Sequence, residues 1–147
     1  MSANPTFGTQ LIGQTEKTMN AILDRLLAGP GLTEPQWVML TLALTSGGPV
    51  DRDQFVARVV GAAKYGEADV RAGISELAAA GLLDAPEGDG STVAVTEAGK
   101  QLHARIRVGV AEITDRLWGD LPPEDLTIAG RVLATVLERA NEELARI

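Results

Sequence analysis

Side chains that could carry out covalent chemistry are few in this chain. Its 147 residues include one histidine, His103, and no cysteine. A Ser-His-Asp site would have to use His103, which flanks an apolar helical stripe and is more simply explained by packing or by exposure on that helix. His103 also lacks partners of its own kind for a metal site. The sequence therefore predicts no catalytic residues, no metal ligands and no cofactor, and we do not expect an enzyme.

Asp51 and Asp53 resemble the paired carboxylates of an acid–base catalyst, but the start of a helix explains both. Asp51 precedes Gln54 by three residues, and Val50 and Phe55 flank the pair, which is the pattern of a capping box with its hydrophobic staple. Asp53 then falls in the first helical turn, where the helix dipole favours negative charge. We predict a helix that begins here.

Composition restricts the class of protein further. The net charge of −7 has the wrong sign for a protein that coats nucleic acid without selectivity, although a local basic patch remains compatible with it. The length and the 45% hydrophobic content fit one domain with its own core. The N-terminus lacks the pattern of a signal peptide, and no apolar run is long enough to span a bilayer. We expect a cytoplasmic, bacterial protein.

The stretch from 66 to 102 organises the rest of the chain. Val70, Ile74 and Leu77 recur at helical spacing, and Gly81 can end that helix in a left-handed conformation. A turn rich in Pro, Gly and Asp follows, and then a β-branched run at 92–95. Thr96 has the position of the next helix cap. The expected order is helix, strand, turn, strand, helix.

Further helices are predicted on both sides of this stretch. Thr33 and Gln36 form a second capping box, so two short helices and a turn lead into the helix at 67–80, in helix-turn-helix order. Apolar positions at helical spacing also mark a first helix around 11–27, a fifth at 102–117 and a sixth at 126–144. The first and sixth are amphipathic and need a surface to cover, either within one subunit or on a second one.

The motifs of this region resemble those of the MarR (multiple antibiotic resistance regulator) family of transcriptional regulators. That family carries Leu-x-x-x-Gly-Leu at the end of its recognition helix and Thr-x-x-Gly at the start of a long helix after the wing. The matching residues here are Leu77, Gly81, Leu82 and Leu83, and then Val95, Thr96 and Gly99. The resemblance implies a mainly α fold, a single domain over 1–147. Its winged helix-turn-helix core with a small two-stranded wing would span 32–101, between dimerisation helices at 6–28 and 102–147.

The resemblance also implies a function. Such a protein is a homodimeric DNA-binding transcription regulator that responds to a small aromatic effector, with one recognition helix in each half of a pseudo-palindromic operator. The residues expected to contact double-stranded DNA are Lys64, Tyr65, Ala68, Arg71, Ala72, Ser75, Ser91, Thr92, Arg52 and Arg58. The residues expected at the effector pocket are Trp37, His103 and Arg107, with core packing as the alternative role of Trp37.

The wing departs from the family pattern and supports an alternative. Asp84, Glu87 and Asp89 lie in it, and no Lys or Arg occurs between Gly81 and Gly99. Because non-specific affinity for DNA comes from phosphates that meet Lys and Arg, this wing offers none of it. The alternative is a winged-helix protein that no longer binds DNA and acts through a protein partner or a ligand.

Overall fold

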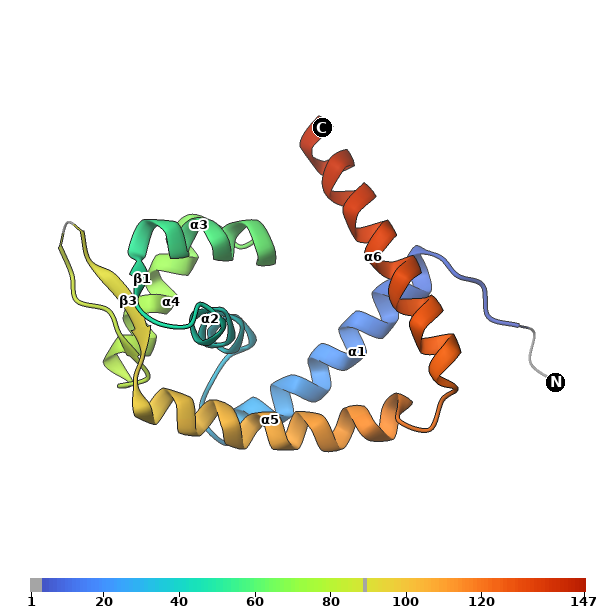
Figure 1. Ribbon diagram of the computed structural model, residues 1–147, viewed down its shortest axis with the longest axis horizontal. Helices are drawn as coiled ribbons and strands as arrows, with labels where there is room; N and C mark the ends of the chain where they lie inside the picture. Colours follow the sequence, from blue (N-terminus) through green and yellow to red (C-terminus); the bar gives the residue numbers. More distant parts are fainter. Residues whose placement is uncertain (1–3, 89) are drawn as a thin grey trace. The chain divides into compact units, whose positions relative to one another are not determined.

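The computed structural model describes residues 4–88 and 90–147, so Asp89 of the wing lies outside the described residues. The helices are α1 (Thr9–Ala28), α2 (Glu34–Thr45), α3 (Arg52–Ala63), α4 (Glu67–Ala79), α5 (Glu97–Trp118) and α6 (Pro123–Arg146), and the strands are β1 (Val50–Asp51), β2 (Leu83–Asp84) and β3 (Thr92–Val95) (Figure 1). The predicted mainly helical, winged helix-turn-helix fold is confirmed. The contacts divide the chain at residues 110 and 111 into two compact units.

The first unit contains the winged core. α2 packs against α3 and α4, and α3 packs against α4. Their apolar faces and the wing strands supply the buried cluster, which includes Met39, Leu40, Phe55, Val59, Val70, Ile74, Leu77 and Val93. The three helices with apolar positions at the predicted spacing are therefore the ones that close this core.

The predicted helix caps are present. The Thr33 hydroxyl accepts a hydrogen bond from the Gln36 amide at 3.3 Å, and the Gln36 side chain accepts one from the Thr33 amide at 2.9 Å. The Asp51 carboxylate accepts a hydrogen bond from the Gln54 amide at 3.0 Å. Each bond satisfies a backbone donor that the first helical turn leaves unpaired.

The wing contains the two predicted strands and is joined by a third. β2 pairs antiparallel with β3, with Leu83 opposite Val95. β1 pairs with the other edge of β3, with Val50 opposite Val93, so the strand order is β1-β3-β2. The sequence analysis assigned Val50 and Asp51 only to the helix cap, because two residues are too few to show a strand period. Asp51 in fact serves both elements.

The end of α4 and the start of α5 are bonded to each other. The Leu82 amide donates to the Leu77 carbonyl at 3.0 Å and the Gly81 amide to the Ala78 carbonyl at 3.0 Å, the two bonds of a Schellman motif, with Gly81 at φ 77°. The Thr96 hydroxyl then donates to the Gly81 carbonyl at 2.7 Å.

The same threonine caps α5, since its hydroxyl accepts a hydrogen bond from the Gly99 amide at 3.0 Å. Its own amide donates to the Leu82 carbonyl at 3.1 Å. Gly99 is buried, and a Cβ there would overlap the Leu82 carbonyl oxygen and lie 2.8 Å from Cγ1 of Val95. The two motifs therefore meet in one joint, the contact between the end of α4 and the start of α5. Glycine is needed at position 99 because the Leu82 backbone occupies the space that a side chain would take.

The second unit, residues 111–147, exposes most of its apolar side chains. α6 has no buried residue, and Leu133, Leu137 and Leu144 on its apolar stripe are 47%, 62% and 53% exposed. Across residues 4–88 and 90–147, none of the helices combines the length and the apolar character needed to cross a membrane. The apolar stripe of α6 is thus exposed to solvent in the single chain.

We predict that Gly99→Ala destabilises the protein by about 2 kcal/mol, because the added methyl group is forced against the Leu82 backbone. The matched control is Gly61→Ala in α3, where a Cβ meets nothing within 4 Å. That change should stabilise the protein by about 1 kcal/mol, since alanine is the better helix former. Urea unfolding followed by far-UV circular dichroism measures both. Equal effects of the two substitutions would contradict a close contact at Gly99.

Candidate nucleic-acid interface

α4 has one buried and one exposed face. Val70, Gly73, Ile74 and Leu77 are buried in the core. Three of the residues expected to contact DNA, Ala68, Ala72 and Ser75, are all exposed. Short side chains on an exposed face let a helix approach another surface closely. The contact of this face of α4 with DNA stays a prediction.

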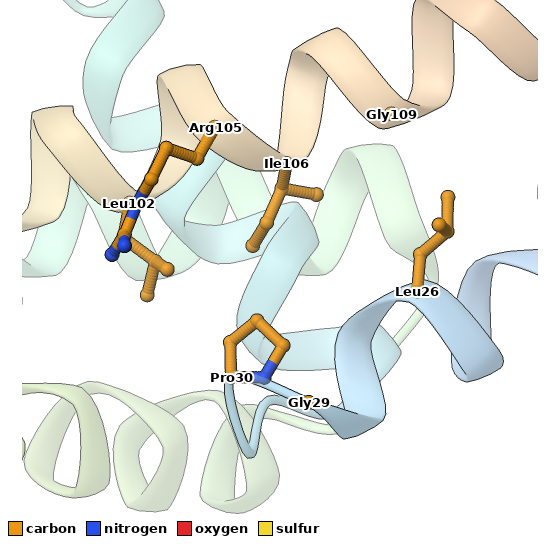
Figure 2. A pocket seen from close by; sticks show the side chains of 7 residues that line it. All are labelled: Leu26, Gly29, Pro30, Leu102, Arg105, Ile106 and Gly109. Atoms are coloured by element: carbon orange, nitrogen blue, oxygen red, sulfur yellow. The ribbon is translucent and has the colours of Figure 1, made fainter.

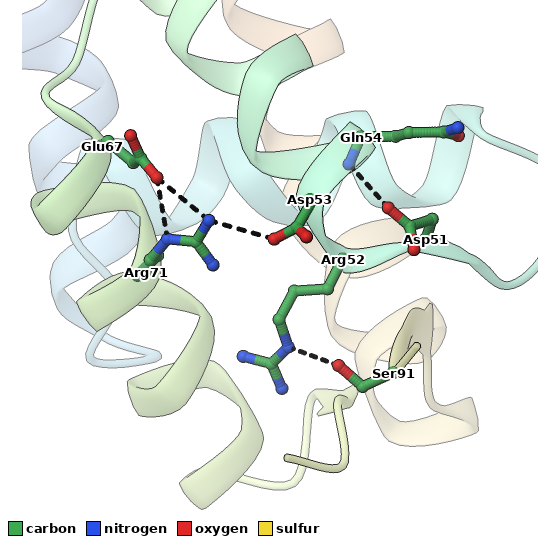
Figure 3. A network of polar contacts seen from close by, with 7 residues as sticks. All are labelled: Asp51, Arg52, Asp53, Gln54, Glu67, Arg71 and Ser91. Carbon is green, nitrogen blue, oxygen red and sulfur yellow. Dashed lines mark hydrogen bonds and ion pairs between the residues drawn. The ribbon is translucent and has the colours of Figure 1, made fainter. Parts of the chain in front are cut away.

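Arg71 is the only basic residue of α4, and it is paired with carboxylates within the protein (Figure 3). Its Nη2 lies 3.0 Å from Oε1 of Glu67 and 3.1 Å from Oδ1 of Asp53, and its Nε donates to the same Glu67 oxygen at 3.1 Å. The hydrogen bonds that the guanidinium donates to Asp53 and Glu67 raise its pKa. The side chain is 41% exposed, so these pairs are in contact with water and each contributes little stability.

Arg52 connects the start of α3 to the wing. Its Nε donates to the Ser91 hydroxyl at 3.0 Å (Figure 3). Its Nη2 donates to the carbonyls of Ala85 at 2.7 Å and Pro86 at 3.0 Å. The Arg52 amide also donates to the Ser91 carbonyl at 3.0 Å. This arginine therefore holds both ends of the wing turn. The phosphate contacts of Arg52 and the DNA contacts of Ser91 and Thr92 stay predictions.

The remaining basic candidates also make hydrogen bonds inside the first unit. Arg58 Nη1 donates to the Ser46 hydroxyl at 2.6 Å and to the Leu42 carbonyl at 3.2 Å, and so joins α3 to the end of α2. Lys64 caps α3 in the left-handed conformation, and its Nζ donates to the Gly61 carbonyl. The cations that the sequence analysis assigned to DNA thus all have partners in the free protein.

Tyr65 occupies the turn between α3 and α4 and is half-buried. Its hydroxyl donates a hydrogen bond to Oε2 of Glu34, at the start of α2. Burial, followed by the hydrogen bond and the charge of Glu34, raises the pKa of the phenol. Tyr65 is therefore a neutral donor fixed toward α2, and its predicted contact with DNA stays a prediction.

Carboxylates outnumber free cations on this face. The described acidic residues of α4 and the wing, all exposed, are Glu67, Asp69, Glu76, Asp84 and Glu87. Only Arg71 opposes them on α4, and two carboxylates already share its charge. A phosphate backbone approaching this face meets negative charge first, which weakens non-specific binding.

Trp37 and His103, two of the three predicted pocket residues, stack on each other. Their ring centroids are 4.4 Å apart with 11° between the planes. His103 is buried, and its Nε2 lies 3.0 Å from the Thr41 hydroxyl. Burial, with a smaller effect of the Arg107 charge, lowers the pKa of the imidazole. The two rings therefore join α2 to α5, and Arg107 stands exposed one turn further along α5.

A cavity of about 400 Å³ lies between the end of α1 and the first half of α5, and none of the three predicted pocket residues lines it (Figure 2). Its walls are mostly apolar, and its one charged group is Arg105. The lining residues are Leu26, Gly29, Pro30, Leu102, Arg105, Ile106 and Gly109. The sequence analysis missed this site, although Leu102, Ile106 and Gly109 share one helical face beside Arg105 and a Gly-Pro break ends the helix opposite.

Comparison with known proteins identifies the fold. No family model and no curated protein matches the chain. A MarR-family regulator from Silicibacter pomeroyi is similar with a TM-score of 0.77 at 21% identity, over 92% of this chain and 90% of that chain. BpsR of Bordetella bronchiseptica, whose DNA binding is regulated by 6-hydroxynicotinic acid, is 24% identical over 91% of this chain and 99% of its own, with a TM-score of 0.69.

A third structure, CouR from Rhodococcus jostii bound to p-coumaroyl-CoA, has a TM-score of 0.73 at 17% identity, over 86% of this chain and 88% of that chain. The coverage on both sides shows that the likeness extends through nearly the whole of each protein. The resemblance to the MarR family, drawn from the motifs around Gly81 and Gly99, is thereby confirmed for the fold.

Proposed function

We propose that this protein is a MarR-family transcription regulator, a homodimer that binds operator DNA through α4 and responds to a small ligand. The observation that carries the proposal is the agreement of its fold with solved MarR-family regulators over almost the whole chain. The exposed face of α4, with Ala68, Ala72 and Ser75, supports it because a helix with short exposed side chains fits the major groove.

Arg71 is the residue that we expect to read a base. In the free protein it is held by Glu67 and Asp53, and both pairs are exposed. Because exposed ion pairs contribute little stability, a guanine edge or a phosphate can replace one of these partners at low cost. The two carboxylates then act as competitors of DNA for Arg71, and binding to random sequences is weak.

We predict that Arg71→Ala lowers affinity for the cognate operator by about 1–3 kcal/mol, as expected for loss of a base contact. Asp53→Asn should raise affinity for any duplex, because it removes a competing charge and leaves Arg71 in place. The control is Asp24→Asn, which removes the same charge from α1 and should change little. Fluorescence anisotropy with operator and random duplexes at two salt concentrations measures these effects. Absence of binding by wild type and by Asp53→Asn at low salt would refute DNA binding.

The second candidate function is a winged-helix protein that binds a partner instead of DNA. The specific observation in its favour is the charge of α4, where Glu67, Asp69 and Glu76 are exposed and the single cation, Arg71, is already paired with Glu67 and Asp53. A basic protein segment would complement this surface. If neither wild type nor Asp53→Asn binds DNA in the titration above, this function is favoured over the first.

The exposed stripe of α6 supports the homodimer. Leu126, Leu133, Leu137 and Leu144 follow one helical face, and apolar patches of this kind mark association sites. α1 adds Leu11 and Met19, which are also exposed. Burial of these faces against a second copy would remove them from water.

We predict a mass near twice 15.4 kDa in light scattering at micromolar concentration. Leu137→Asp should shift the protein to the monomer, because an unpaired carboxylate would be buried in the interface. Thr135→Asp introduces the same charge on the opposite face of α6 and should leave the dimer intact. A monomeric wild type, or equal effects of the two substitutions, would contradict the assignment of α6 to the interface.

The cavity between α1 and α5 is the proposed effector site. Its apolar walls, formed by Leu26, Pro30 and Ile106, suit an aromatic ring, and Arg105 suits a carboxylate. The Arg105 side chain makes no hydrogen bond or ion pair within residues 4–88 and 90–147, so its guanidinium is available to a ligand. The predicted pocket residues Trp37, His103 and Arg107 would act from outside this cavity.

We predict that phenylacetate binds this cavity and that Arg105→Ala weakens binding about tenfold or more, as for loss of a charged hydrogen bond. Arg116→Ala is the control, since Arg116 is exposed in the last turn of α5 and does not line the cavity. Isothermal titration calorimetry measures both. Equal losses in the two variants, or an unchanged affinity in Arg105→Ala, would exclude this cavity as the carboxylate site.

A further inference from the structure

Another hollow lies between α2 and α4, along the border between the exposed and the buried face of α4. It is a groove of about 310 Å³, and its lining comes from the start of α2, from Tyr65 and from four residues of α4. The α4 positions 69, 72, 73 and 76 recur at helical spacing, so they form one continuous wall. This volume is at the lower end of the range for small-molecule sites.

The floor of the groove is apolar. Pro35 and Met39 come from α2, and Ala72 and Gly73 come from α4. Gly73 is buried, and a Cβ there would lie 2.9 Å from Sδ of Met39, so the lack of a side chain lets the thioether sit directly against α4. An apolar part of a ligand can therefore rest on Met39 between the two helices.

Two side chains that line the groove donate hydrogen bonds to carboxylates. Gln36 Nε2 donates to Oε2 of Glu76 at 2.8 Å, and the Tyr65 hydroxyl donates to Oε2 of Glu34. Each bond engages one oxygen, which leaves the other oxygen of each carboxylate able to accept. Asp69 lies on the wall that α4 contributes.

The charge of the groove is of one sign. Asp69 and Glu76 line it, and its lining includes no Lys, Arg or His. Asp69 makes no side-chain hydrogen bond or ion pair with the residues that the structure describes. The raised pKa of the Tyr65 phenol, caused by burial and then by Glu34, agrees with this environment.

We propose that the groove between α2 and α4 binds a small organic cation, an ammonium group on an apolar body. The ammonium group is placed between Asp69 and Glu76, and the apolar body lies on Pro35, Met39 and Ala72. The Tyr65 ring, fixed by its bond to Glu34, borders the same space and adds a cation–π contact. This ligand class is opposite in charge to the one proposed for the cavity of Arg105, so the protein would have two sites of different selectivity.

The probe is 2-phenylethylamine, with 2-phenylethanol as a neutral analogue of the same shape, and calorimetry at low salt measures binding to the full chain. We expect the amine to bind about tenfold more tightly than the alcohol, since it gains exposed ion pairs with two carboxylates. Asp69→Asn and Glu76→Gln should each weaken amine binding about fivefold. Ala72→Leu should abolish it by filling the groove without changing charge.

Glu97→Gln is the control, because it removes an exposed carboxylate at the start of α5 and should leave amine affinity unchanged. Far-UV circular dichroism and thermal unfolding verify that each variant is folded. Equal affinity for the amine and the alcohol, no saturation up to about 10 mM amine, or unchanged binding in Asp69→Asn and Ala72→Leu would overturn the proposal. The titration contains no DNA, so its outcome is separate from that of the DNA-binding proposal.

Discussion

The joint between α4 and α5 is the constraint on which the winged core depends. One hydroxyl, that of Thr96, caps α5 and donates to the carbonyl of Gly81 at the end of α4. Gly99 lets the first turn of α5 lie against the Leu82 backbone, where no side chain fits. Through these contacts the direction of the presented helix, the root of the wing and the start of the long helix are fixed together.

Arg52 extends the same constraint to both ends of the wing turn. Its guanidinium bonds to Ser91, Ala85 and Pro86, and its amide adds a further bond to Ser91. β1 contributes at the opposite edge of β3. A wing held at both ends can carry a neutral or acidic surface without losing its shape. Charge on the wing is therefore free to vary independently of the fold, and here it is acidic.

Electrostatics set the character of the proposed sites more than shape does. α4 has a single arginine shared by two carboxylates. The α1–α5 cavity has an arginine with apolar walls, and the α2–α4 groove has carboxylates over an apolar floor. Each surface charge contributes little binding energy, because water and salt screen it. The ligand that each proposed site selects therefore depends on which of its charged side chains has no partner within the protein. For Arg71 that partner is supplied by the protein, and for Arg105 it is left to a ligand.

The sequence by itself determined the helices, the capping residues Thr33 and Asp51, and the stop at Gly81, because these follow from local periodicity and local hydrogen bonding. It also located the motif of Thr96 and Gly99, although only the fold revealed that the two face the end of α4. The partners of Arg71 and Arg52, the stacking of Trp37 on His103, and the cavity beside Arg105 were decided by tertiary structure alone. Each of these depends on side chains from different helices, or from a helix and the wing, meeting at distances of a few ångströms. No local pattern in a single sequence encodes such meetings, since they arise from how the helices pack.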